Sequence, residues 1–115
     1  MKIIGTGVDI IENSRIKKSI LNNSFLNRVF TNKEILISEK MKNKSSYFAK
    51  RFAAKEAIKK ALSSYKESAN QSFKSIEVLN SKSGKPYVVS QTNEDINISI
   101  SHDGNYAVAF CIIDK

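Results

Sequence analysis

RFAAKEAIKKAL, residues 51–62, predicts a single helix. Its small and apolar residues recur at the i, i+3, i+4, i+7 spacing of a buried helical stripe: Ala54, Ala57, Ile58 and Ala61. Four basic residues surround this stripe and would suit phosphate groups: Arg51, Lys55, Lys59 and Lys60. The single carboxylate among them, Glu56, is therefore either a surface counter-ion or part of a chemical site.

The segments before this helix predict a strand followed by helices. KIIGTGVDII (2–11) is rich in β-branched residues and is interrupted by Gly5 and Gly7, and it predicts a strand. The pair NS (13–14) can cap a short helix, and TNKE (31–34) has capping-box spacing and begins another. The pair SS (45–46) then caps the longest helix, which runs to about Leu62.

The segments after the helix predict antiparallel strands. FKSIEVLN (73–80) and KPYVVS (85–90) flank the turn signal SKSG. INISIS (96–101) and NYAVAFCII (105–113) flank the dipeptide DG, which is a strong hairpin turn. A strand, then helices, then an antiparallel meander is typical of an α+β fold, and 115 residues fit one domain, 1–115.

The composition indicates a globular protein with an excess of basic residues. It is 41% hydrophobic and 26% charged, and no apolar run approaches the roughly 20 residues that cross a bilayer. The N-terminal residues lack the pattern of a signal peptide, and Cys111 is the single cysteine, so we expect a reducing cytoplasm and no internal disulfide. The net charge of +8 indicates an acidic partner or a solvated basic surface.

Asp9 and Glu56 are the two carboxylates that invite a chemical interpretation. Strand alternation predicts which residues share the face of Asp9: Ile3, Gly5, Gly7 and Ile11. A buried carboxylate is normally paired or bound to a metal, although Asp9 could instead cap the next helix. Glu56 could likewise form an i,i+4 pair with Lys60. If the two carboxylates face each other, they would suit magnesium together with waters and phosphate oxygens.

Four ordered stretches cover nearly the whole chain: GTGVDIIENSRI (5–16), FLNRVFTNKE (25–34), YFAKRFAAKEAIKKAL (47–62), and IEVLNSKSGKPYV with ISISHDGNYAVAF (76–88 and 98–110). Together they resemble the holo-acyl-carrier-protein synthases, the small single-domain 4′-phosphopantetheinyl transferases. The resemblance implies transfer of the 4′-phosphopantetheine arm of coenzyme A to a serine of acyl carrier protein, with release of adenosine 3′,5′-bisphosphate, for fatty acid biosynthesis. It also implies a homotrimer with sites between subunits.

The resemblance implies roles for individual residues. Asp9 and Glu56 match the family's two magnesium ligands, and Lys60 matches the lysine near the reacting phosphates of coenzyme A. The stretches that line the coenzyme A site contain Arg51, Gly84, Lys85, Pro86, Ser101 and His102. The basic residues expected to meet the acidic carrier protein are Arg15, Lys17, Lys18 and Arg28. A metal-bound water, or Glu56 through a water, is expected to take the serine proton.

The chain departs from the family after Leu62, where Ser63, Ser64 and Tyr65 replace the usual glycines, so the loop 63–72 is expected to be rebuilt. His102 is expected to contact the ligand or finish a turn rather than act as a base. Cys111 lies in an apolar strand and is expected to be a packed thiol rather than a nucleophile paired with that histidine.

Two other functions compete with the transferase interpretation. A small basic nucleic-acid-binding protein would explain the charge, but its basic residues would normally alternate with exposed aromatic side chains. An inactive relative that binds coenzyme A or the carrier without transfer is supported by the altered loop and opposed by the presence of Asp9, Glu56 and Lys60. We therefore expect neither nucleic acid nor a membrane to be the partner.

Overall fold

The computed structural model describes residues 2–66, 72–90 and 93–115. The elements of these residues are, in chain order, β1 (Ile3–Glu12), α1 (Asn13–Ser19), α2 (Asn23–Val29), α3 (Asn32–Ser38), α4 (Lys44–Ser63), the 3₁₀ turn η1 (Phe73–Ser75), β2 (Glu77–Asn80), β3 (Pro86–Val89), β4 (Asp95–Asp103) and β5 (Tyr106–Asp114). This order confirms the α+β class. No helix in the described ranges has both the length and the apolar character needed to cross a bilayer.

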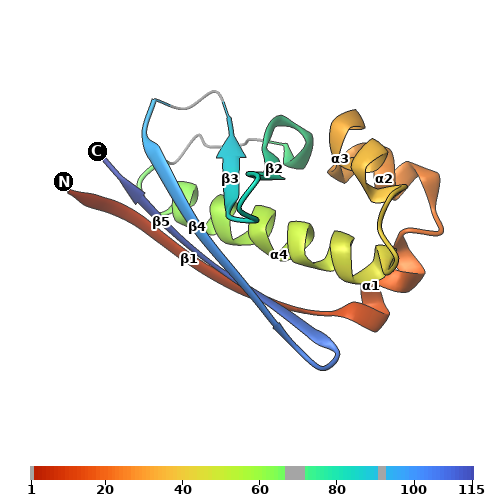
Figure 1. Ribbon diagram of the computed structural model, residues 1–115. Coiled ribbons are helices and arrows are strands. Elements are labelled where there is room, and N and C mark those ends of the chain that lie inside the picture. The colour runs from red at the N-terminus through yellow and green to blue at the C-terminus, as the bar shows by residue number, and fades with distance from the viewer. Residues whose placement is uncertain (1, 67–71, 91–92) are drawn as a thin grey trace.

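Helix α4 is the central element, and it lies along one face of a three-stranded antiparallel sheet of order β1-β5-β4 (Figure 1). Its predicted stripe of Ala54, Ala57, Ile58 and Ala61 is fully buried. The helix begins earlier than predicted, because the side chain of Asn43 accepts a hydrogen bond from the Ser46 N–H at 3.0 Å and acts as the N-cap.

Two glycines of β1 allow α4 to approach the sheet closely. A Cβ atom placed on Gly7 would lie 2.0 Å from the carbonyl oxygen of Ala57, and one on Gly5 would lie 2.3 Å from that of Ala61. No side chain fits in either place, so the helix backbone packs directly on the strand backbone. The predicted interruption of the strand by glycine therefore marks the contact with α4.

The pairing of the strands decides which residues of β1 face α4. Asp9 pairs with Ala109, and Ala109 with Ile100, and this row lies on the face that α4 covers, as Gly7 and Ile11 do. The predicted inclusion of Ile3 on this face is wrong, because the register shifts between Ile3 and Gly5 and the side chain of Ile3 is 53% exposed.

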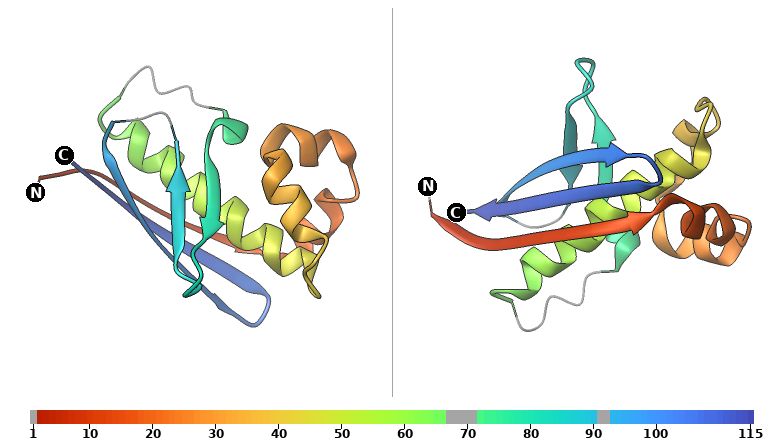
Figure 2. Two further views of the ribbon diagram at one scale, coloured as in Figure 1. Left: turned by 45° about the horizontal axis from the view of Figure 1, so that its top comes forward. Right: turned by 90° about the horizontal axis from the view of Figure 1, so that it is seen from below.

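The opposite face of this sheet carries large exposed apolar side chains from two neighbouring strands: Val8, Ile10, Tyr106 and Phe110. Val8 pairs with Phe110 across β1 and β5, so these side chains form one continuous patch. We call these four residues the outer apolar face. Within the described part of the chain, no helix covers this face of the sheet (Figure 2).

The remaining elements flank α4. Strands β2 and β3 form a separate two-stranded sheet, joined by the predicted turn, in which Gly84 has a φ of +89°. Helices α1, α2 and α3 gather at the N-terminal end of α4 (Figure 1). Thr31 and Glu34 form the predicted capping box of α3. Helix α1 begins at Asn13 with Glu12 as its N-cap residue, so neither Asn13 nor the following serine caps it as predicted.

Candidate metal and anion sites

A polar hollow of about 140 Å³ between β1 and α4 contains both singled-out carboxylates. It is lined by Asp9, Ile10, Ile11, Arg15, Phe52 and Glu56. Asp9 reaches it through strand alternation, and Glu56 reaches it from the side of α4 that lies over β1. The structure therefore places Asp9 and Glu56, which are far apart in the sequence, at the same hollow.

Lys60 does not line this hollow itself but forms an ion pair with Asp9, which does. Its Nζ is 3.2 Å from Asp9 Oδ1 and donates a hydrogen bond to the carbonyl oxygen of Val8 at 3.1 Å. The Lys60 side chain is 54% exposed, whereas that of Asp9 is 16% exposed. The alternative i,i+4 ion pair between Lys60 and Glu56 does not form among the described residues. None of the ion pairs within residues 2–66, 72–90 and 93–115 involves Glu56, so no basic side chain there neutralises its carboxylate.

The oxygen atoms of Asp9 and Glu56 fit a hard divalent cation. Magnesium is typically held by one or two carboxylates, with water and substrate phosphate oxygens completing its coordination. Among residues 2–66, 72–90 and 93–115, no cluster of three or more His, Cys, Asp or Glu side chains could hold a metal by itself. Any cation here would therefore need oxygens from water or from a bound ligand, as magnesium does.

Arg51 forms a second site with a different chemistry. Its side chain is only 6% exposed, its Cζ lies 3.9 Å from the centroid of the Tyr47 ring, and Nη2 donates to Asn80 Oδ1. In the described residues no carboxylate pairs with it, and its buried Nε has no hydrogen-bond partner. Burial lowers the pKa of the guanidinium.

A hollow of about 240 Å³ beside Arg51 is lined by Met41, Lys42, Asn43, Ser46, Tyr47, Lys50, Arg51 and Asn80. Three of these residues are basic and none is acidic. A nearly buried guanidinium without a counter-ion is costly unless an anion pairs with it. The hollow is therefore suited to an anionic ligand group such as a phosphate, which arginine binds through two parallel hydrogen bonds.

Asn80 is a residue that the sequence analysis missed, and it connects Arg51 to the predicted GKP stretch. Its Nδ2 donates to the carbonyl oxygen of Gly84 at 2.9 Å, while its Oδ1 accepts from Arg51. Lys85 follows this turn, and Pro86 begins β3. The signal that could have found Asn80 is its position directly before the SKSG turn, where an asparagine side chain commonly bonds to nearby backbone.

Ser101 and His102 lie at the end of β4 and line neither of these two hollows. Both are exposed, and strand alternation turns them to opposite faces of the sheet. His102 pairs with Ala107 on β5, whereas Cys111 pairs with Ile98 further along the same strand. Cys111 is fully buried, and burial raises the pKa of its thiol to about 12, so it is a packed thiol as expected.

The interpretation of Lys55 as a phosphate-facing residue is wrong. Its side chain has no exposed surface, and its Nζ lies 2.6 Å from Glu34 Oε1. Lys59 is half-buried beside an aromatic ring, with Nζ 4.1 Å from the centroid of Phe73. The charges on α4 thus face different sides of the helix.

The four basic residues predicted to meet the carrier protein lie on α1 and α2, and Lys17, Lys18 and Arg28 are exposed there. Arg15, which is also exposed, additionally lines the hollow of Asp9 and Glu56. Arg15 therefore connects the basic surface of α1 to that hollow. A partner bound on α1 would be placed next to the two carboxylates.

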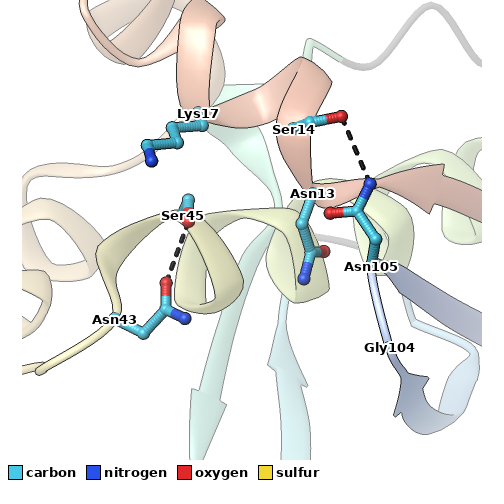
Figure 3. A pocket seen from close by; sticks show the side chains of 7 residues that line it. All are labelled: Asn13, Ser14, Lys17, Asn43, Ser45, Gly104 and Asn105. Carbon is cyan, nitrogen blue, oxygen red and sulfur yellow. Dashed lines mark hydrogen bonds between the residues drawn. The ribbon is translucent and has the colours of Figure 1, made fainter.

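A larger hollow of about 380 Å³ lies between α1, the start of α4 and the β4–β5 turn, and it is lined by Asn13, Ser14, Lys17, Asn43, Ser45, Gly104 and Asn105 (Figure 3). Asn105 Nδ2 donates to Ser14 Oγ at 3.3 Å, and Ser45 Oγ donates to Asn43 Oδ1 at 2.9 Å. It contains no carboxylate, so it does not offer the ligands of the predicted metal site.

The serines that replace the usual glycines cause no backbone strain. α4 ends at Ser63, and Ser64 follows as its C-cap residue with φ −71° and ψ −16°, which are ordinary angles. The Ser64 hydroxyl donates to the carbonyl oxygen of Ala61 at 2.6 Å. The rebuilt loop predicted over 63–72 lies partly outside the described residues.

Known proteins resemble the chain along its whole length. Residues 5–111 match the family model of the 4′-phosphopantetheinyl transferase superfamily. The chain is 45% identical to a holo-[acyl-carrier-protein] synthase of Pelagibacter ubique (strain HTCC1062), with 100% of this chain and 99% of the relative covered. It is 46% identical to one of Thermodesulfovibrio yellowstonii, with 96% of this chain and 98% of the relative covered.

Solved structures resemble the fold equally well. A holo-(acyl-carrier-protein) synthase from Bacillus anthracis in complex with CoA (3′,5′-ADP) matches with a TM-score of 0.87 and 36% identity, over 98% of this chain and 97% of that one. One from Helicobacter pylori in complex with coenzyme A matches with a TM-score of 0.81 and 30% identity, over 95% and 99% of the two chains.

Proposed function

The chain belongs to the 4′-phosphopantetheinyl transferase superfamily, among its holo-[acyl-carrier-protein] synthases, and we propose that it moves the 4′-phosphopantetheine arm of coenzyme A to a serine of an acyl carrier protein. The observation that carries this proposal is the hollow that Asp9 and Glu56 share beside Lys60 and Arg15. The holo-carrier would serve fatty acid biosynthesis in the cytoplasm.

Asp9 and Glu56 would hold magnesium during this reaction. When bound, the cation would offset the negative charge of the coenzyme A diphosphate. The serine Oγ attacks the phosphorus that carries pantetheine, and the bond from this phosphorus to the bridging oxygen breaks. Adenosine 3′,5′-bisphosphate then leaves with that oxygen, and the half-exposed Lys60 can donate hydrogen bonds to it. Glu56 can accept the serine proton through a water, since the carboxylate lies in the same hollow.

The hollow beside Arg51 would bind the 3′-phosphate of coenzyme A. Coenzyme A carries two separated anionic groups, its diphosphate and its 3′-phosphate, and the chain offers a site suited to each. Lys85, with Gly84 and Pro86, would add contacts through the turn that Asn80 joins to Arg51. Ser101 and His102 would contact the coenzyme from the end of β4.

The Arg51 site gives a prediction that separates the two anionic groups. Arg51→Leu is expected to raise the KM for coenzyme A about tenfold or more, because a charge-assisted hydrogen bond to phosphate is lost. The same variant is expected to leave the KM for 3′-dephospho-coenzyme A nearly unchanged, which steady-state kinetics can measure. An equal rise in KM for both substrates would show that the 3′-phosphate does not bind at this site.

The positions of these two sites favour a coenzyme shared between subunits. Arg51 and Glu56 are five residues apart on α4, which turns them about 140° away from each other around the helix axis. Arg51 faces Asn80 of β2, whereas Glu56 faces Asp9 of β1. Two protomers could therefore each supply one site to the same coenzyme A, consistent with a homotrimer.

The outer apolar face is the surface on which we expect the homotrimer to form. Phe110→Lys should produce monomers in analytical ultracentrifugation and lose most transfer activity, because a charge cannot be buried there without a partner. Leu36→Lys is the matched control, since Leu36 is also exposed but lies on α3. A variant at Phe110 that stays trimeric would place the interface elsewhere.

Docking of the acidic carrier protein is expected to depend on salt. Raising the ionic strength from about 0.02 M to about 0.5 M should lower kcat/KM for the carrier about tenfold, because screening weakens attraction to Arg15, Lys17, Lys18 and Arg28. Lys17→Gln with Lys18→Gln should flatten this dependence, whereas Lys33→Gln on α3 should not. A rate that does not respond to salt would exclude the α1 face as the docking surface.

A further inference from the structure

A buried ion pair that the proposed reaction does not use joins α4 to α3. Lys55 Nζ lies 2.6 Å from Glu34 Oε1, and neither side chain has exposed surface. The same Nζ donates to the carbonyl oxygens of Val29 at 2.8 Å and Phe73 at 3.1 Å. Each of the three N–H bonds of this ammonium group therefore has an acceptor.

Glu34 is equally well satisfied, and its partners come from further segments. Oε1 also accepts the backbone N–H of Thr31 at 2.8 Å, and Oε2 accepts that of Val78 at 2.8 Å. The backbone carbonyl of Glu34 accepts the hydroxyl of Tyr47 at 2.7 Å. The pair thus fixes α4 to the end of α2, the start of α3, η1 and β2.

The position of this pair on α4 relates it to the carboxylate site. Lys55 directly precedes Glu56, and Ala57 directly follows it. A Cβ atom on Gly7 would lie only 2.0 Å from the carbonyl oxygen of Ala57, so the backbones of α4 and β1 are in contact here. Strand β1 therefore blocks any movement of Ala57 toward the sheet. Glu56 therefore sits between two residues that are held on different sides of the helix.

We infer that the Lys55–Glu34 pair is a positioning device that fixes the rotation of α4, so that Glu56 meets Asp9 in the shared hollow. Directional hydrogen bonds suit this role, because a buried ion pair is often no more stabilising than apolar side chains of similar volume. Groups that orient a ligand residue in this way control metal affinity without touching the metal. This inference rests on the proposed role of Asp9 and Glu56.

The test is binding of Mn²⁺, a hard cation with oxygen preferences like those of magnesium. Free Mn²⁺ would be followed by electron paramagnetic resonance during titration of the full chain with coenzyme A present. Lys55→Met is expected to weaken Mn²⁺ binding about tenfold, and the milder Glu34→Gln severalfold, since loss of an orienting partner typically costs 10–100-fold. Glu34→Gln keeps the side-chain volume and serves if Lys55→Met does not fold.

The matched control is Ile113→Ala, which removes a fully buried side chain from β5. Its loss of stability would be compared with that of the pair variants by urea unfolding. If Mn²⁺ affinity falls in the pair variants and not in Ile113→Ala, the positioning role is supported. If all of them bind Mn²⁺ like the wild type, while Asp9→Asn does not bind, the positioning role is overturned and the metal site stands. If Asp9→Asn also binds like the wild type, the metal site itself is overturned and the inference with it.

Discussion

Glu56→Ala is expected to lower kcat/KM for carrier modification by about 10³-fold or more while leaving the chain folded. The loss follows from removing one of two carboxylates that would hold the charge-stabilising cation, a contribution of several kcal/mol. Asp9→Ala should have a similar effect, and the double variant should lose little more, because groups that act as a unit are not additive. Steady-state kinetics with coenzyme A and apo-carrier measure all three variants.

Glu39→Ala is the control for this prediction. Glu39 is an exposed carboxylate at the end of α3, outside the hollow of Asp9 and Glu56. Its replacement should leave kcat/KM within about twofold, because an exposed charge away from the site changes little. Near-normal turnover of Glu56→Ala would contradict the assignment of the hollow.

Gly7→Ala is expected to destabilise the fold by about 3 kcal/mol or more, the upper end of what overpacking usually costs. The added Cβ would lie 2.0 Å from the Ala57 carbonyl oxygen, a backbone atom that no side-chain rotation can move away. Urea unfolding followed by circular dichroism measures the change in the free energy of unfolding.

Thr6→Ala is the neighbouring control, since Thr6 is exposed on the other side of β1. Its replacement should change stability by no more than about 0.5 kcal/mol. A fully stable Gly7→Ala chain would show that α4 does not rest directly on β1. In Gly7→Ala, displacement of α4 would also separate Glu56 from Asp9, so this variant should lose transfer activity as well as stability.

Local patterns were sufficient for the parts of the fold that depend on neighbours in sequence. The apolar spacing of residues 51–62 predicted the buried stripe of α4, and the TNKE spacing predicted the capping box of α3. Helix α2 was missed, although Asn22 caps it by accepting from the N–H groups of Ser24 and Phe25. The cap signal was present there, but only a short apolar pattern of Phe25, Leu26 and Val29 follows it.

Long-range packing explains what the sequence could not show. In sequence, Lys55 cannot be told from the other basic residues of α4. It is buried because its ammonium group binds partners far away in the chain, namely Glu34 and the carbonyl oxygens of Val29 and Phe73. The outward position of Ile3 depends on a register shift at the end of β1. Asp9 and Glu56 could be singled out from their unusual neighbours in the sequence, but the hollow that they share depends on how α4 lies over β1.

Intact-mass analysis of an apo acyl carrier protein tests the central claim most directly. The carrier would be incubated with this chain, coenzyme A and magnesium, beside reactions that contain EDTA or the Asp9→Ala or Glu56→Ala chain. We predict a gain of one phosphopantetheine group with the wild-type chain, and its loss in all three comparison reactions. If a well-folded wild-type chain adds no mass to the carrier, the proposed transfer is contradicted and the chain is an inactive binder. If the mass gain survives EDTA and both substitutions, the proposed metal site is contradicted.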